Sequence, residues 1–146
     1  MTDADVVFKT IQVCSDSVSF VGEVPSVPRY IDGFVIPIKK DRVEDYRRLS
    51  EQASAVWKDN GALDYWECVG DDLEIPEMKS FLELAGAGPD ETVIFAWAMF
   101  ESREHRDACN EKIVADPRLN EMYDPNNLPF DSKRMAFGGF RELVHR

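Results

Sequence analysis

From Tyr30 onward, the chain alternates between short apolar runs and longer segments whose apolar residues recur at helical spacing. The short runs are rich in β-branched and aromatic residues, which is typical of strands. They predict four strands, at Tyr30–Ile38, Ala62–Val69, Thr92–Phe100 and Lys133–Leu143. The third run is so continuously apolar that we expect it at the centre of a sheet.

A long helix is predicted between the first two strands. Its apolar positions recur every three or four residues from Val43 to Val56. Asp41, followed by Glu44, gives a helix N-cap signal, and Asn60-Gly61 offers a left-handed stop. We therefore expect a helix from about Arg42 to Asp59.

The second half of the chain contains three further helical signals. Glu77–Ala85 predicts a short helix that ends at Gly86, inside the connection between the second and third strands. Ser102 is expected to cap a second long helix that runs to about Ala115. Asp116-Pro117 combines a cap with a proline at the first helical position, so another helical turn should follow.

This order, β-α-β-β-α-β, predicts an α+β, ferredoxin-like domain with a four-stranded antiparallel sheet. The first and third strands should be central, and both long helices should cover one face. The other face then carries Phe, Tyr, Trp and Met side chains with no cover of its own. A second copy related by a two-fold axis usually buries such a face, so we expect a homodimer, arranged as a dimeric α/β barrel.

The first 28 residues differ from the rest of the chain. Val6–Cys14 and Val18–Val24 are β-prone and predict a possible hairpin, followed by a linker that contains Pro25 and Pro28. We therefore divide the chain into an N-terminal extension, residues 1–28, and the ferredoxin-like domain, residues 29–146.

The charge, the cysteine spacing and the N-terminal residues indicate which partners and which compartment to expect. A net charge of −11 without a local basic stripe argues against nucleic acid. Cys14, Cys68 and Cys109 are widely spaced and lack a CxxC pair, which favours reduced cytosolic thiols. Asp3 and Asp5 stand where a signal peptide needs positive charge, and no apolar run approaches a membrane span. We expect a cytoplasmic protein with no membrane partner.

Several short motifs occur in one order along the domain and together resemble a known family. They are Tyr30-Ile31-Asp32-Gly33-Phe34, Gly61-Ala62-Leu63, Glu67-Cys68, Gly70-Asp71-Asp72, Phe95 with Trp97, Arg106-Asp107, Ala115-Asp116-Pro117-Arg118, Pro129-Phe130-Asp131, Lys133-Arg134-Met135 and Gly138-Gly139-Phe140. This pattern resembles the YbaA-like family of uncharacterised bacterial proteins, a domain of unknown function in the dimeric α/β-barrel superfamily. The resemblance covers roughly Arg29 to Val144 and implies the fold and the dimer. It implies no catalytic residue.

Three charged residues, Asp32, Glu67 and Arg134, lie in otherwise apolar strands, where an unpaired charge is costly. Strand alternation places Asp32 on the same face as Phe34 and Ile36. Glu67 and Arg134 should lie on opposite edges of the sheet, roughly 14 Å apart, too far to touch within one protomer. They therefore share a ligand, pair across the dimer, or point to water at an edge.

Aromatic residues complete the candidate site. Trp57, Trp66 and Trp97 are more often core residues than pocket residues. Trp97, expected mid-sheet beside Phe34, is the best pocket candidate among them. The candidates for a ligand pocket on the open face are Asp32, Phe34, Tyr65, Glu67, Trp97 and Arg134.

The second long helix carries a second cluster, which is a candidate for a metal site or a nucleophile. His105 and Cys109 are four residues apart and share a helix face, with Glu101 one turn earlier as a third possible ligand. Two soft ligands do not make a site, and no base-orienting partner for a Cys-His nucleophile is evident. We expect neither a metal nor a cofactor. Gly138-Gly139 has no following helix and should permit a bulge or a close dimer approach.

Three functional hypotheses remain. The first is a homodimer that binds a small organic molecule on the open sheet face. The second is a cofactor-independent enzyme in which Asp32 or Glu67, with a raised pKa, acts as general base and Arg134 steadies an anion. The third is an interaction dimer without a ligand. The sequence does not decide between them.

Overall fold

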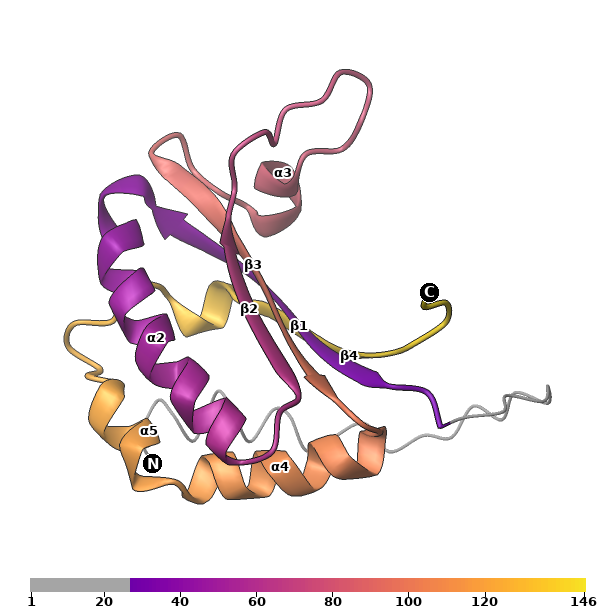
Figure 1. Ribbon diagram of the computed structural model, residues 1–146. Coiled ribbons are helices and arrows are strands. Elements are labelled where there is room, and N and C mark those ends of the chain that lie inside the picture. The colour runs from indigo at the N-terminus through magenta and orange to yellow at the C-terminus, as the bar shows by residue number, and fades with distance from the viewer. Residues whose placement is uncertain (1–26) are drawn as a thin grey trace.

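The computed structural model describes residues 27–146. The predicted hairpin, Val6–Cys14 and Val18–Val24, lies outside the described residues. The described chain forms one four-stranded sheet with helices, and its elements follow the predicted βαββαβ order (Figure 1).

The sheet has the strand order β2-β3-β1-β4, and each neighbouring pair is antiparallel. The strands are β1 (Tyr30–Lys39), β2 (Asp64–Val69), β3 (Glu91–Phe100) and β4 (Ala136–Arg141). The first and third strands are central, as predicted, and β2 and β4 form the edges. The ferredoxin-like α+β fold is therefore confirmed.

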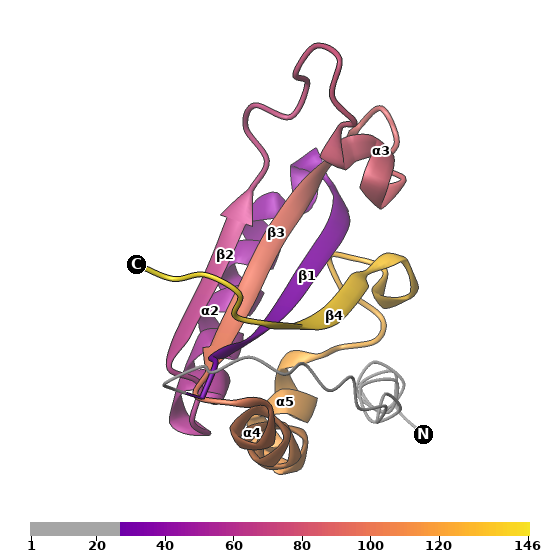
Figure 2. The same cartoon turned by 90° about the vertical axis from the view of Figure 1, so that its right-hand side faces the viewer.

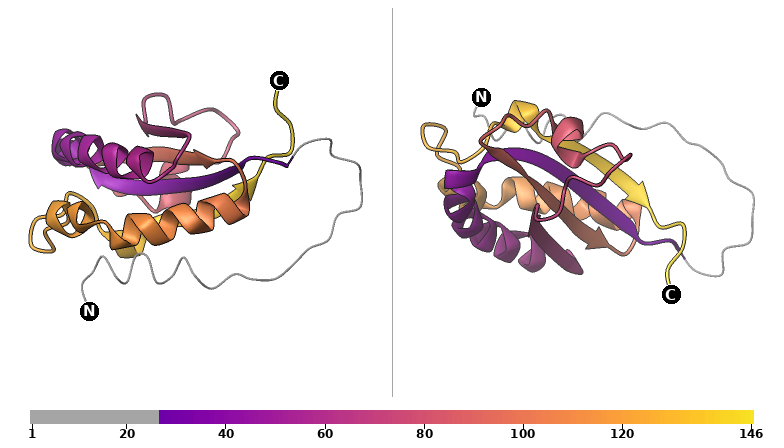
Figure 3. Two further views of the ribbon diagram at one scale, coloured as in Figure 1. Left: turned by 60° about the horizontal axis from the view of Figure 1, so that its bottom comes forward. Right: turned by 90° about the horizontal axis from the view of Figure 1, so that it is seen from above.

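Helices α2 (Val43–Asp59) and α4 (Arg103–Ala115) pack on one face of the sheet, with α5 (Pro117–Met122) beside them (Figures 1 and 3). A further short helix, α3 (Phe81–Ala85), belongs to the β2–β3 connection. The core between helices and sheet combines large residues from each element. Phe100, Val56, Ile113 and Leu119 are all almost fully buried there. Their burial supplies the hydrophobic free energy that fixes the helices on this face.

The predicted cap of the first long helix and the predicted start of the last strand are wrong. Asp41 does not cap the first helix, because Lys40–Arg42 forms a 3-10 turn, η2, that leads directly into α2, and no side chain caps α2. The last strand begins at Ala136 instead of Lys133, because the Asp131 carboxylate accepts a hydrogen bond from the Lys133 N–H and starts a second 3-10 turn, η3 (Ser132–Arg134). That turn delays strand pairing by three residues.

The sequence signals at the end of α3 and at the start of α4 predicted these helix ends correctly. Ser102 accepts a hydrogen bond from the His105 N–H and starts α4 at the predicted residue. Gly86 ends α3 in the left-handed conformation, with φ of 65°. The helix begins later than predicted, at Phe81, because Glu77 itself has a positive φ of 66° and cannot be helical. Within residues 27–146, no helix is long and apolar enough to cross a membrane.

Candidate functional site

The face of the sheet opposite α2 and α4 is the first candidate site, and we call it the open face. Alternation along the strands, together with the registers Gly33↔Trp97 and Gly33↔Gly138, identifies its side chains. They are Ile31, Gly33, Val35 and Pro37 of β1, Asp64, Trp66 and Cys68 of β2, Val93, Phe95, Trp97 and Met99 of β3, and Ala136, Gly138 and Phe140 of β4. Among these strand residues, none in the middle of the face is charged.

Helix α3 covers one end of the open face, which corrects the expectation of a face without any cover. Phe81 packs against Phe95, with ring centroids 6.0 Å apart. Beneath this end, Val93 is 2% exposed and Pro37 is fully buried. Figure 2 shows α3 at the end of the sheet where β1 finishes and β3 begins. Among residues 27–146, no element covers the other half of the face, near the start of β1.

An aromatic cluster occupies the uncovered half. Trp66 and Trp97 stack almost in parallel, with centroids 5.6 Å apart and an interplanar angle of 12°. Phe95 contacts Trp97 at 5.4 Å. Trp66 is 51% exposed and Phe95 is 45% exposed, which is unusual for large aromatic groups that lie side by side. The Trp66 indole N–H donates to Asp64 at 3.0 Å, so this carboxylate at the margin of the face is already engaged with the cluster.

The glycines of the open face accommodate aromatic rings of the same protomer. A Cβ on Gly33 would lie 3.1 Å from the Phe140 ring, and one on Gly138 would lie 3.7 Å from it. On the opposite face, a Cβ on Gly139 would clash with Tyr30 at 2.4 Å. The β1–β4 register is continuous from Ala136 to Arg141, so the predicted bulge is absent. Phe140, which stands over Gly33, is 61% exposed.

The six predicted pocket residues do not lie together. Asp32, Phe34, Tyr65 and Glu67 project from the sheet toward the helices, and only Trp97 projects onto the open face. Arg134 lies in η3, where its guanidinium binds Glu91 at 2.8 Å and the Gly86 carbonyl at 2.9 Å. The prediction that these residues share one pocket on the open face is therefore corrected. Trp97 is paired with Gly33, on the face opposite Phe34.

Asp32 forms a buried ion pair that sequence reasoning missed. Its carboxylate accepts a hydrogen bond from Arg106 of α4 at 2.7 Å, and both side chains are almost fully buried. Arg106 also binds Asp107 at 2.8 Å and lies over the Tyr30 ring, 4.7 Å from its centroid. Burial raises the pKa of Asp32 to about 6, against the opposing influence of Arg106 and of a hydrogen bond from Asn110. The residue therefore serves to attach α4 to β1.

The raised pKa of Asp32 gives a testable pH dependence. The unfolded carboxyl ionises near 3.8 and the folded one near 6, so the unfolded state loses its proton first as the pH rises. Between these values the contribution of Asp32 to the free energy of unfolding should fall, by roughly 3 kcal/mol in total. Urea unfolding at pH 4.5 and 6.5 should show this fall in the wild type. The fall should be smaller in Asp32→Asn, and equal slopes in the two proteins would contradict the assignment.

Glu67 projects from β2 toward α2 and is held by two tyrosines. Its carboxylate accepts hydrogen bonds from Tyr46 at 2.8 Å and from Tyr65 at 2.6 Å. Burial raises the pKa of Glu67, while the two phenols lower it. Burial and the neighbouring carboxylate raise the pKa of both phenols as well. Glu67 thus has partners within its own protomer, and none of the three arrangements predicted for it is needed to satisfy the charge.

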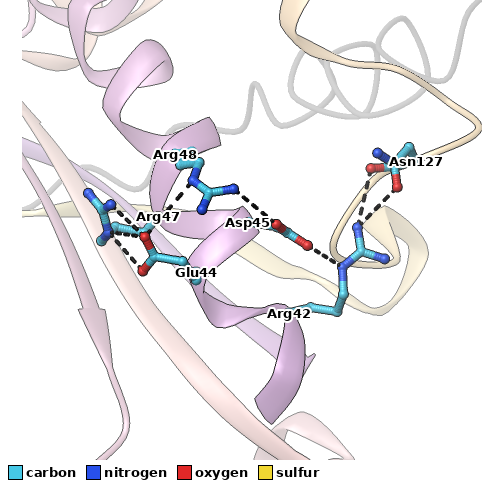
Figure 4. A network of polar contacts seen from close by, with 6 residues as sticks. All are labelled: Arg42, Glu44, Asp45, Arg47, Arg48 and Asn127. Carbon is cyan, nitrogen blue, oxygen red and sulfur yellow. Dashed lines mark hydrogen bonds and ion pairs between the residues drawn. The ribbon is translucent and has the colours of Figure 1, made fainter.

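Surface contacts near the start of α2 support the group formed by Glu67, Tyr46 and Tyr65 from outside. Arg42 donates to Asp45 at 2.8 Å and to the Asn127 side-chain oxygen at 3.3 Å, which ties the loop before β4 to the helix (Figure 4). Phe130, three residues further along that loop, packs edge-on against Tyr46, with centroids 5.7 Å apart. The remaining pairs in Figure 4, between Arg47 or Arg48 and Glu44 or Asp45, are exposed, so each contributes little to stability.

His105 and Cys109 are in contact, but their surroundings are those of a packed helix face. The Glu101 backbone N–H donates to His105 Nδ1 at 3.1 Å, so the neutral ring carries its proton on Nε2. Nε2 lies 3.4 Å from the buried Cys109 Sγ, and burial raises the pKa of that thiol. Gly61 packs on the same pair. Among the described residues, no three His, Cys, Asp or Glu side chains gather as metal ligands.

A groove of about 330 Å³ lies in the helix layer and includes none of the six predicted pocket residues. Its lining comes from α2 and α5: Gln52, Ala55, Arg118, Glu121 and Met122. Arg118 is already engaged there by Asp116 at 2.7 Å and by Asp59 at 2.8 Å. The groove thus offers a ligand little uncommitted charge.

The fold and the open face define a ferredoxin-like α+β domain with one half-covered apolar sheet face. The family described as "Protein of unknown function (DUF1428)" matches residues 29–132. Two proteins, each called "Uncharacterized protein YbaA", from Escherichia coli K12 and Shigella flexneri, are 36% identical over 116 residues. Each match covers 80% of this chain and 97% of the relative. The chain therefore belongs to the DUF1428 family.

A comparison of folds finds the crystal structure of a dimeric ferredoxin-like protein from an uncultured marine organism. Its TM-score is 0.45, its sequence identity is 11%, and the match covers 80% of this chain and 95% of that one.

Proposed function

We propose that this protein functions as a homodimer that assembles through the uncovered half of its open face. The observation that carries the proposal is the uncharged cluster of Trp66, Trp97 and Phe95, in which Trp66 and Phe95 are about half exposed in the protomer. Elsewhere the chain is strongly acidic, with a net charge of −11. Because two copies repel each other, contact is favoured where charge is lacking. An apolar face of this kind is the usual core of an isologous interface.

Sedimentation velocity of the full chain over a wide concentration range tests the proposal. We expect a dimer at micromolar concentration, and a salt dependence in which added salt strengthens association by screening the like charges. A protein that remains monomeric at the highest concentration would contradict the proposal. Added salt that weakened the dimer would indicate an interface formed by ion pairs instead of the open face.

Small-molecule binding remains a second candidate function and is supported by one observation. Trp66 is 51% exposed and stacks on Trp97, so its indole offers an apolar surface to which a planar organic molecule could bind. Of the six residues predicted for such a pocket, Trp97 is the one that lies here. Native mass spectrometry of the purified dimer would detect a bound molecule as additional non-covalent mass.

The enzyme hypothesis is less well supported by the geometry. Glu67 has the raised pKa that a general base needs, but both of its oxygens accept hydrogen bonds from phenols. Arg134 is bound to Glu91 and lies away from Glu67. The cytoplasmic location expected from the sequence stays a prediction.

A further inference from the structure

We infer that residues 142–146 pack against the open face of the partner protomer, so that the two copies exchange these segments. The inference rests on the proposed homodimer and specifies what else is buried in its interface. It concerns the chain that follows β4, which we call the tail.

The tail contains two exposed apolar residues and lies on the open-face side of the sheet. Its last hydrogen bond with the domain is from the Glu142 N–H to the Arg29 carbonyl, at 2.9 Å. Beyond that point, Leu143 is 94% exposed and Val144 is 81% exposed. The tail leaves β4 on the open-face side and stands away from the sheet, and it crosses in front of β3 and β2 when that face is viewed (Figures 1 and 2).

The tail also starts at the uncovered end of the open face. Arg141 of β4 is paired with Tyr30 at the beginning of β1, and Phe100 of β3 lies on the other side of Tyr30. Helix α3 covers the opposite end. A second copy that occupies the uncovered half therefore comes within reach of residues 142–146, which extend roughly 16 Å.

The size of the uncovered surface supports an additional contact. Four strands spaced about 4.8 Å apart, over some five residues each, give a flat footprint of roughly 300 Å². A standard interface buries about 800 Å² on each partner. Sheet contact alone is therefore small, and the exposed Leu143 and Val144 add apolar area next to it. In a two-fold interface this contact occurs twice, once from the tail of each protomer.

The first test is sedimentation of the full-length double variant Leu143→Ser/Val144→Ser. Loss of four apolar side chains from one interface should raise the dimer dissociation constant at least tenfold. The matched control is Val114→Ser on α4, where an exposed valine lies on the helix layer. This control should leave the constant within twofold of the wild type. A wild-type dimer that the double variant does not weaken would overturn the inference while leaving the proposed dimer intact.

A second test identifies which chain the tail contacts. A photoreactive p-benzoylphenylalanine at position 144, irradiated in the dimer, should yield a covalent dimer whose cross-linked peptide includes β2 or β3. Cross-links confined to a single chain would show that the tail covers its own open face, and would overturn the exchange. A monomeric wild type would instead reject the proposed function, and with it this inference.

Discussion

Replacing Arg106 with alanine should lower the free energy of unfolding by about 3–5 kcal/mol at pH 7.5, because it leaves a buried carboxylate without its partner. Asp32 is 1% exposed, and Arg106 is its charged partner at 2.7 Å. The loss should be smaller at pH 5, since the Asp32 pKa of about 6 means that the carboxyl is already largely protonated there. Urea unfolding of wild type and variant at both pH values measures the effect.

Two companion variants make this prediction specific. Arg118→Ala removes an arginine that also binds two carboxylates, Asp116 and Asp59, but on the surface, and it should lose only a small fraction as much stability. Asp32→Asn combined with Arg106→Ala should be more stable at pH 7.5 than Arg106→Ala alone, because no buried charge then remains. An Arg106→Ala variant that resembles Arg118→Ala would show that the pair is not buried in solution.

The fold could be predicted from sequence because its signals are local and agree with one another. Apolar run lengths identified four strands, helical spacing identified both long helices, and Ser102 and Gly86 placed two helix ends correctly. The failures came where a 3-10 turn replaced the predicted start of an element. Asp131 capped a 3-10 turn that shortened β4, and Lys40–Arg42 took the place of a capped helix start. Neither alternative changes the hydrophobic pattern, so the pattern could not reveal it.

The candidate site was harder to predict because it depends on strand register. Alternation shows which residues of one strand share a face, but only the pairing of Gly33 with Trp97 shows that Trp97 and Phe34 face opposite ways. A shift of one residue exchanges the two faces. The sequence pattern also did not indicate the partners of the charged residues. Arg106 is on a helix 74 residues from Asp32, and the donors to Glu67 are uncharged phenols, which a search for opposite charges does not consider.

The sequence predicted an apolar open face but did not predict that α3 would cover one end of it. The sequence indicated a helix near Gly86, yet nothing local indicated that α3 would lie against Phe95 and bury Val93. Arg134 fixes this arrangement by binding both Glu91 and the Gly86 carbonyl, which joins the end of α3 to η3. An arginine predicted to contact a ligand thus holds the structure that limits the proposed dimer surface to half of the sheet.

Phe140→Asp should raise the dissociation constant of the proposed homodimer at least a hundredfold. Phe140 is 61% exposed on the open face, so the folded protomer should tolerate a polar residue there. In a two-fold interface, however, the substitution places two carboxylates in an apolar contact, and each must be desolvated without a partner. A hundredfold change corresponds to about 2.7 kcal/mol. Sedimentation velocity measures the constant, and thermal unfolding of the dilute protein checks that the protomer remains folded.

The control for this variant is Val114→Asp, which adds the same charge to an exposed apolar position of α4, on the helix layer. Both variants increase the net charge of the protomer by one negative unit, so general repulsion between copies is matched. Only Phe140→Asp alters the open face, where the ring covers Gly33 and Gly138. Equal weakening by the two variants would assign the effect to overall charge. Weakening by Val114→Asp alone would place the interface on the helices, and the apolar sheet face would then need a different occupant.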